Sequence, residues 1–363
     1  MLISTNFVLF YSYYVIMFIG CNMKSIYDLT KEELENYFIS KGEKKFKATQ
    51  VFEWLYQKKV NSFDDMSNIK KDIINTLNED FKISNLKIIT KQIDVDVCKY
   101  LFELDDKNEI EAVLMKHDYG NSLCVSSQVG CNMGCKFCES GRLKKVRNLE
   151  TYEMVLQLLQ VEQDLGIRIS HLVLMGIGEP FDNYDNVIKF IDIINDPKGL
   201  ALGSRHITVS TSGIIPKIKD FINNGKQVNL AISLHAANNE LRSKLMPINK
   251  AYNLNDLMDV IKEYINKTNR RVTFEYILLS GINDNTKDAI ELANLLKGIN
   301  CYVNLIPYNE TSHIEYKKSS QKTIMEFYDT LKKHNINVTI RKEFGKKVSA
   351  ACGQLRAKHK EGQ

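Results

Sequence analysis

Three cysteines within eight residues form the pattern in this sequence that is best suited to chemistry. Cys131, Cys135 and Cys138 follow the spacing C-x3-C-x2-C. Three thiolates from one short loop suit a cubane iron–sulfur cluster in which one iron has no protein ligand. A small molecule can coordinate that iron and accept an electron from it. The alternative is a structural zinc site, which needs four ligands and would have to recruit Cys124 from a predicted strand.

The composition of the 363 residues is that of an ordinary globular protein, with 44% hydrophobic and 26% charged residues. It excludes a disordered chain, a collagen-like repeat and a heptad fibre. Eight cysteines are too few for a disulfide scaffold, and four of them fall between Cys124 and Cys138. In an intracellular protein, such clustering indicates metal or redox chemistry.

The formal net charge of +5 is small, but basic residues gather in two segments. Residues 341–360 hold seven basic residues and one acidic residue, and residues 139–147 hold four basic residues and one acidic residue. Such runs are often solvated surface. The sharper interpretation is a footprint for a polyanion such as RNA phosphate.

The first 22 residues carry no charge and are mostly apolar. They are long enough to span a membrane, but they lack the basic start and the cleavage site of a secretory signal. We expect translation to begin at Met23, which would make residues 1–22 a non-native extension. The alternative is a membrane-tethered protein.

The next two segments are predicted to be an accessory domain and a ribbon. Residues 23–85 show three helical patterns, the first opened by the capping-box sequence Thr30-Lys31-Glu32-Glu33. We interpret this segment as a helical accessory domain that binds RNA. Residues 86–116 contain three alternating stretches, which predict an antiparallel β-ribbon that links it to the rest.

Residues 117–341 alternate six times between strand-like and helical patterns, which predicts an α/β fold with a parallel sheet, open or closed. The predicted strands are 123–126, 172–175, 207–209, 228–233, 272–278 and 301–306. The predicted helices include 150–165, 185–195, 215–224, 254–267 and 286–298. A basic tail, residues 342–363, follows.

Polar residues stand where the predicted strands end. In a (β/α) barrel the carboxyl ends of the strands form the active face, so these side chains are expected to converge. Each alone is a weak signal, but their shared position after successive strands strengthens it. They are Gly178 and Glu179, Ser210, Ser233 and His235, and Asn309.

The cysteine motif after the first barrel strand and the Gly178-Glu179-Pro180 turn after the second resemble the radical S-adenosylmethionine (SAM) superfamily. Three further segments make the resemblance more specific. These segments, 123–131 (LCVSSQVGC), 230–249 (LAISLHAANNELRSKLMPIN) and 350–355 (AACGQL), resemble RlmN-type adenine-C2 methyltransferases of 23S rRNA and tRNA. The resemblance covers about residues 23–357.

The resemblance implies a partial (β/α)6 TIM-like barrel of the radical SAM type, with a small N-terminal helical domain and a β-ribbon extension. It implies that Cys131, Cys135 and Cys138 bind a 4Fe–4S cluster. The SAM contacts that it implies are Gly178, Glu179, Ser210, Ser233, Leu234, His235 and Asn309.

The implied reaction explains why such residues are needed. Adenine C2 is an electron-poor carbon that cannot attack the methyl group of SAM, whereas a carbon radical can add to it. The resemblance implies two SAM molecules: the first methylates Cys352, and the second yields the radical that activates this methyl group. Glu111 would be the proton acceptor, and Cys124 would release the enzyme through a transient disulfide with Cys352.

Each of these three residues has a simpler interpretation when it is taken alone. Cys352 lies among small residues that could form an idle tail. Cys124 could be core packing, since a free cysteine behaves as a small hydrophobe. Glu111 could face solvent from a strand.

The resemblance further implies 23S rRNA and tRNA as partners and a low-potential electron donor such as flavodoxin or ferredoxin. It implies a cytoplasmic, monomeric enzyme without membrane contact. Three features depart from the family. Glu139 follows the third cluster cysteine, where a small residue is usual, and Lys346, Lys347 and Ser349 replace an acidic-rich stretch. The uncharged extension before Met23 has no counterpart.

Two rival functions stay open. One is a Cfr-type adenine-C8 methyltransferase, although Pro180 and Pro307 look more like the C2 enzymes. The other is a non-catalytic RNA-binding protein with a structural zinc site.

Overall fold

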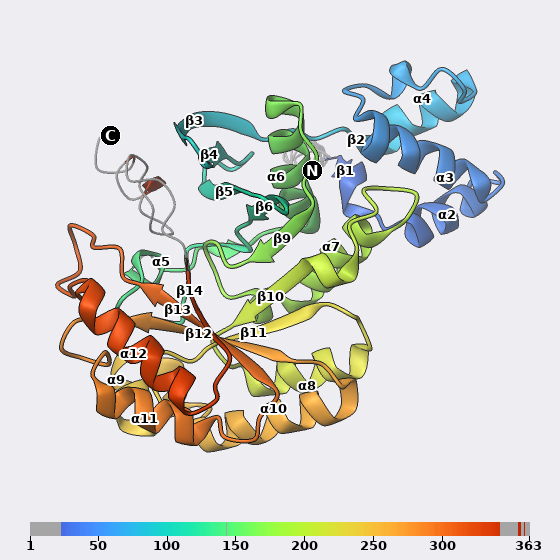
Figure 1. Ribbon diagram of the computed structural model, residues 1–363. Coiled ribbons are helices and arrows are strands. Elements are labelled where there is room, and N and C mark those ends of the chain that lie inside the picture. Colours follow the sequence, from blue (N-terminus) through green and yellow to red (C-terminus); the bar gives the residue numbers. More distant parts are fainter. Residues whose placement is uncertain (1–22, 143, 342–354, 357–358, 360–363) are drawn as a thin grey trace, which may run out of the picture.

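The computed structural model describes residues 23–142, 144–341, 355–356 and 359, and its centre is a ten-stranded sheet (Figure 1). The strands lie in the order β14-β13-β12-β11-β10-β9-β6-β5-β4-β3. Neighbours from β14 to β6 run parallel, and neighbours from β6 to β3 run antiparallel. The predicted extension 1–22 and Cys352 lie outside the described residues.

The parallel part contains the six predicted strands and one more. Its strands are β6 Gly120–Cys124, β9 His171–Leu174, β10 Ile207–Thr211, β11 Asn229–Ser233, β12 Val272–Leu278, β13 Cys301–Pro307 and β14 Val338–Ile340. Strand β14 was not predicted, because three residues are too few to show the alternation of apolar and polar residues that is typical of a strand. The strand is recruited by β13, with Leu305 opposite Ile340.

Helices connect the parallel strands as the alternating pattern predicts. They are α6 Thr151–Leu165, α7 Tyr184–Asn195, α8 Ile215–Asn224, α9 Asn239–Leu245, α10 Leu254–Thr268, α11 Thr286–Leu295 and α12 Gln321–Lys333. Local signals set their ends: the Asn253 side chain accepts the Asp256 N–H at the start of α10, and Gly166 ends α6 with φ 61°. Figure 1 shows α8, α10, α11 and α12 along one side of the sheet.

The predicted ribbon extends the same sheet. It consists of β3 Lys87–Asp94, β4 Val97–Glu103 and β5 Glu109–His117, and β5 pairs with β6. Strand β4 is buried along nearly all of its length. The ribbon therefore supplies side chains to the interior of the molecule, like the parallel strands beside it.

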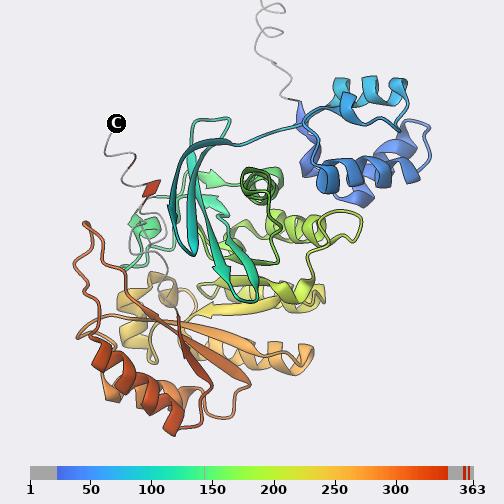
Figure 2. The same ribbon diagram turned by 45° about the horizontal axis from the view of Figure 1, so that its top comes forward.

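The N-terminal helices form a lobe beside the sheet (Figure 2). They are α2 Lys31–Ser40, α3 Phe46–Glu53 and α4 Lys71–Asp80, with the short strands β1 Lys24–Ser25 and β2 Phe81–Lys82. The predicted capping box is present, because Thr30 and Glu33 exchange hydrogen bonds of 2.8 and 3.1 Å. Glu33 also pairs with Lys189 of α7 at 2.7 Å, and Asp28 accepts the Tyr152 N–H of α6 at 3.0 Å.

Short elements complete the described structure. They are β7 Gln128–Val129, β8 Arg147–Asn148, α5 Glu139–Arg142, the 3-10 turns Ile26–Asp28, Phe63–Asp65, Pro180–Asn183, Ser204–His206 and Pro247–Lys250, and the π turn Trp54–Lys58. Within the described residues, no helix combines the length and the apolar composition that crossing a bilayer requires.

Candidate active site

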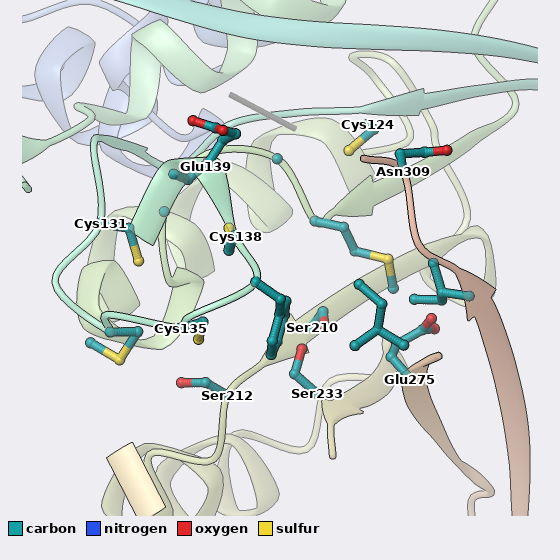
Figure 3. Close-up of a pocket in the computed structure, with 18 of the residues that line it drawn as sticks. Cys124, Cys131, Cys135, Cys138, Glu139, Ser210, Ser212, Ser233, Glu275 and Asn309 are labelled. Carbon is teal, nitrogen blue, oxygen red and sulfur yellow. The ribbon is translucent and has the colours of Figure 1, made fainter. Parts of the chain in front are cut away.

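A cavity of about 330 Å³ opens at the carboxyl ends of the parallel strands (Figure 3). Most of the residues that the sequence singled out line it: Glu111, Cys124, Cys131, Cys135, Cys138, Gly178, Glu179, Ser210, Ser233, His235 and Asn309. Leu234 does not line the cavity; its side chain is buried in the core, and its N–H donates to the Glu275 carbonyl at 3.0 Å. Cys352 lies outside the described residues.

The loop with the three cysteines is fixed by its own backbone and by a neighbouring helix. The Cys138 N–H donates to the Cys135 carbonyl at 3.2 Å, and the Lys136 N–H donates to the Leu245 carbonyl at the end of α9 at 2.9 Å. Gly141 is required here, because a Cβ at this position would lie 2.8 Å from the Cys135 carbonyl oxygen. The loop is therefore held in a compact form against the cavity.

The donor set of three thiolates from one loop fits an iron–sulfur cube with one open iron. Within the part of the chain that the structure describes, no three side chains converge as the ligands of one ion would. A cube does not need such convergence, because each cysteine binds a different iron. Burial raises the pKa of Cys131 to about 12 and raises those of Cys135 and Cys138, so the three thiols need a cationic group to ionise.

Glu179 lies beside this loop as a preorganised carboxylate. It is 4% exposed, and its two oxygens accept the backbone N–H groups of Phe181 at 3.1 Å and Ser212 at 2.8 Å. Burial raises its pKa, and these hydrogen bonds oppose that shift. Gly178 leads into it with φ 109°, where a Cβ would lie 2.6 Å from the Gln128 Cβ. The carboxylate can accept hydrogen bonds from an ammonium group.

His235 is a neutral donor of fixed orientation. Its Nδ1 accepts the Ile277 N–H at 3.0 Å, so the ring proton is on Nε2. Burial, with the nearby Arg242 charge, lowers its pKa to about 3. The ring packs edge-on against Phe137 of the cysteine loop, with centroids 4.8 Å apart. His235 can therefore donate one hydrogen bond to a ligand without becoming charged.

Arg242 of α9 connects the loops that follow β10 and β11. The sequence analysis did not identify it as a site residue. It is fully buried and donates to the carbonyls of Ser212 at 2.7 Å, Leu234 at 3.2 Å and Ser233 at 3.3 Å, and to Asn249 Oδ1 at 2.8 Å. Its helical context (LRSKL) also fits an ordinary surface arginine, so no local signal identifies it. Even with its pKa lowered to about 10 by burial, the guanidinium stays charged at neutral pH.

A row of polar side chains crosses the sheet below the loops. Ser233, Glu275 and Asn304 are opposite one another on β11, β12 and β13, and the Asn304 amide donates to Glu275 Oε2 at 2.8 Å. Glu275 is 5% exposed and lines the cavity, although the sequence reading missed it because it lies in the middle of a predicted strand. Burial raises the pKa of Glu275, and the Arg341 charge opposes this.

The ribbon supplies the opposite wall. Glu111 of β5 is 2% exposed and forms an ion pair with Lys99 of β4, with Glu111 Oε2 and Lys99 Nζ 3.0 Å apart. The Arg356 N–H donates to Glu111 Oε1 at 2.7 Å. Glu111 therefore lies in the cavity wall and does not face solvent.

Cys124 ends β6 on the same wall. It packs against Val97 and Met115, as the simple core interpretation expects, and it also lines the cavity. Burial raises the pKa of its thiol, and the charges of Arg341 and Lys99 oppose that shift. The structure brings Cys124 into the same cavity as the three-cysteine loop, while Figure 3 shows it apart from that loop.

The basic segment 139–147 is largely neutralised by acidic partners. Arg147 pairs with Glu153 and with Asp106, each at 2.7 Å, and Lys145 pairs with Asp182 at 2.8 Å. Glu139, one of the departures from the family pattern, pairs with Arg142 at 3.2 Å. Most basic side chains of this segment therefore form ion pairs within the protein. Among its described residues, Lys144 is an exposed lysine that could contact RNA.

Family models match both the N-terminal helical lobe and the part of the chain that forms the parallel sheet. The Radical SAM superfamily matches residues 125–293, and the ribosomal RNA large subunit methyltransferase N-terminal domain matches residues 24–83. A curated Acholeplasma laidlawii protein, named probable dual-specificity RNA methyltransferase RlmN, is 54% identical over 335 residues, covering 92% of this chain and 99% of that protein. An Enterococcus faecalis protein of the same name is 56% identical over 344 residues, covering 92% and 96%.

A solved structure agrees with these matches. The crystal structure of a radical SAM methyltransferase from Sphaerobacter thermophilus aligns with a TM-score of 0.86 and 38% identity, covering 91% of this chain and 98% of that chain. The predicted radical SAM α/β fold class is thereby confirmed. The chain belongs to the RlmN family of radical SAM RNA methyltransferases.

Proposed function

We propose that this enzyme methylates C2 of adenine in 23S rRNA and in tRNA, through a methyl group carried on Cys352. The observation that carries the proposal is the shared cavity. The three-cysteine loop, Glu111 and Cys124 all line it. Adenine C2 needs a radical source, a proton acceptor and a second thiol, and these groups supply the protein's part of each.

The residues present fit both cofactors that the family requires. Cys131, Cys135 and Cys138 would hold a 4Fe–4S cluster with one open iron. Glu179 would accept the ammonium group of SAM, and the close packing of Gly178 against Gln128 holds the turn that presents this carboxylate. The other SAM contacts in the proposal are Ser210, Ser233, Leu234 through its backbone, His235 and Asn309. Bound together, the cluster and SAM supply one-electron chemistry that generates a carbon radical.

Cys352 is connected to this cavity by a short segment. Arg356 comes four residues later in the chain, and its N–H is hydrogen-bonded to Glu111. Four residues span at most about 14 Å. Because Arg356 is held at Glu111, the proposal has the Cys352 sulfur act in the cavity that Glu111 and Cys124 line.

The protein side chains would act in sequence on the RNA base. The methyl group on Cys352 would lose one hydrogen atom to that carbon radical, and the methylene radical left on the sulfur would add to C2 and form a carbon–carbon bond. One electron passes to an iron–sulfur or flavin-class acceptor, and Glu111 takes the C2 proton. The Cys124 thiolate then attacks the Cys352 sulfur, forming a disulfide and breaking the sulfur–carbon bond. The carbon keeps that electron pair and takes a proton to become the methyl group, and a thiol reductant later reopens the disulfide.

The proposed partners follow from this reaction. A cluster of this kind needs a low-potential electron donor, for which flavodoxin or ferredoxin is proposed. The substrate is RNA, and the enzyme is proposed to act in the cytoplasm as a monomer. In the proposal the N-terminal lobe, residues 23–85, serves as an accessory RNA-binding domain.

The position of the methyl group is the direct test. The anaerobically reconstituted enzyme, SAM, a reductant and unmodified 23S rRNA or tRNA would be incubated, and the digested nucleosides analysed by mass spectrometry. The proposal predicts 2-methyladenosine from the wild type and none from Cys352→Ala with its iron content intact. Appearance of 8-methyladenosine alone would establish the Cfr-type reaction instead. Full activity of Cys352→Ala would refute the methyl-carrying role.

A further inference from the structure

A buried lysine lies in the cavity wall and has no part in the reaction as proposed so far. The Lys99 side chain is 1% exposed, and its ammonium is 3.0 Å from Glu111 Oε2, whose side chain is 3% exposed. Both residues line the cavity. Removing such a pair from water costs several kcal/mol per ion in real proteins, and apolar residues of similar volume are often as stable or more so. Stability alone therefore explains the pair poorly.

The strand register places Lys99 with the other reactive side chains. Lys99 is opposite Val113 on β5, and Val113 is opposite Cys124 on β6. Glu111 is two residues from Val113, so all four side chains emerge on the same face of the sheet. The Lys99 ammonium thus attracts the Glu111 carboxylate directly. The same charge opposes the rise that burial causes in the pKa of the Cys124 thiol.

The backbone of the C-terminal tail completes the arrangement. The Arg356 N–H donates to Glu111 Oε1, while Lys99 is on the Oε2 side. These two contacts reach different oxygens of the carboxylate and so orient Glu111. The charged or titratable groups around Glu111 are Lys99, Glu109, Cys124, Arg341, Arg356 and, paired with Glu109 at 2.8 Å, His359.

We infer that Lys99 is a positioning residue that pairs with the Glu111 carboxylate and aims it into the cavity, ready to remove the C2 proton. The inference rests on the proposed function. In this step the C2–H bond breaks, the proton goes to Glu111, and the bonding electron pair stays in the base. Lys99 keeps its own proton throughout. Its role is electrostatic, since an adjacent cation favours the charged form of a carboxylate.

The lifetime of the covalent enzyme–RNA adduct tests this role. The adduct joined through Cys352 is covalent in the proposed mechanism, so it is expected to survive denaturing gels and to decay only after the C2 proton has been removed. In the wild type we expect a decay rate that rises with pH only as the Cys124 thiol ionises. In Lys99→Met we expect decay about tenfold slower or more near neutral pH and recovery as pH rises, since a fully buried carboxyl without a cation titrates about three to five units higher. In Glu111→Gln the decay rate is expected to stay far below that of the wild type at every pH.

Matched variants separate charge from structure. Lys99→Arg keeps the charge and is expected to keep the wild-type pH profile, whereas Lys99→Gln is expected to resemble Lys99→Met. Lys91→Met removes a lysine of the same ribbon that pairs with Asp164 at 2.9 Å and does not line the cavity, so its decay profile is expected to be unchanged. Iron content and the yield of 5′-deoxyadenosine are expected to stay at wild-type values in all four lysine variants.

Two results would overturn the inference. One is a decay profile of Lys99→Met and Lys99→Gln that superimposes on the wild type. The other is failure of both neutral variants to fold while Lys99→Arg folds normally, which would make the lysine structural. A wild-type enzyme that forms neither adduct nor methylated RNA would instead defeat the proposed function itself, and the role of Lys99 with it.

Discussion

Arg242 Nη2 is 2.7 Å from the carbonyl oxygen of Ser212, and the same guanidinium reaches the carbonyls of Ser233 and Leu234. One buried side chain of α9 thus joins the ends of β10 and β11. Glu179 is in turn held by the Ser212 N–H. The position of the carboxylate proposed to bind the SAM ammonium therefore depends on an arginine that does not line the cavity.

The first prediction follows from this relationship. Arg242→Met should lower the free energy of unfolding by about 3 kcal/mol, because several buried carbonyls lose their donor, and it should weaken SAM binding. Urea unfolding and calorimetric titration with SAM measure the two effects. Arg270→Met is the control, since Arg270 contacts Gln227 and Asn229 at the other end of β11. Unchanged SAM affinity in Arg242→Met would show that the loops hold their form without it.

The second prediction concerns acid stability. The pKa of His235 is about 3 in the folded protein, against about 6.5 in an unfolded chain. Between these values the unfolded state binds the extra proton, so stability falls as pH falls from about 6.5 towards 3, by up to about 1.4 kcal/mol per pH unit. His235→Asn should unfold with a shallower pH dependence, measured by urea denaturation. His334 is exposed, so His334→Asn is the control variant. If the unfolding free energies of the wild type and both variants changed equally with pH, His235 would not be a buried neutral ring.

The third prediction separates structural from RNA-facing basic residues. Arg147→Met leaves the buried Glu153 carboxylate without its bidentate partner, and we expect a loss of about 3 kcal/mol in unfolding free energy. The salt dependence of RNA binding should not change. Lys144→Met should leave stability unchanged and reduce the slope of log K against log salt by about 0.9, if this loop touches one phosphate. If Arg147→Met changed the salt dependence of RNA binding and left stability unchanged, the whole segment 139–147 would be an RNA-binding surface after all.

The fourth prediction concerns the metal. Cys135→Ala should lose most of the bound iron, because only two of the three thiolates would remain to hold the cube. Cys301→Ala removes a buried cysteine at the start of β13 and should keep the wild-type iron content. Iron and sulfide analysis of anaerobic preparations measures both. Full iron in Cys135→Ala, or stoichiometric zinc in the wild type, would contradict the cluster.

The sequence predicted those site residues that can be recognised from their neighbours in the chain. The cysteine spacing and Glu179 were identifiable because each depends on a short motif or on a position after a strand. Lys99, Arg242 and Glu275 were not, because burial of a charged side chain is decided by partners far away in sequence: Glu111, Ser212 and Asn304. The pairing of Arg147 with Asp106, 41 residues earlier in the chain, was missed for the same reason, since a run of like charges does not show its acidic neighbours in space.

The fate of the hydrogens on the transferred methyl group tests the central claim most directly. With SAM carrying a fully deuterated methyl group, the proposed route removes one deuterium while the methyl is on Cys352 and replaces it from solvent. We therefore predict 2-methyladenosine whose new methyl group holds two deuterium atoms, read by mass spectrometry of the digested RNA. A product that retains all three would mean that the methyl group was transferred intact, and the radical route through Cys352 would be wrong.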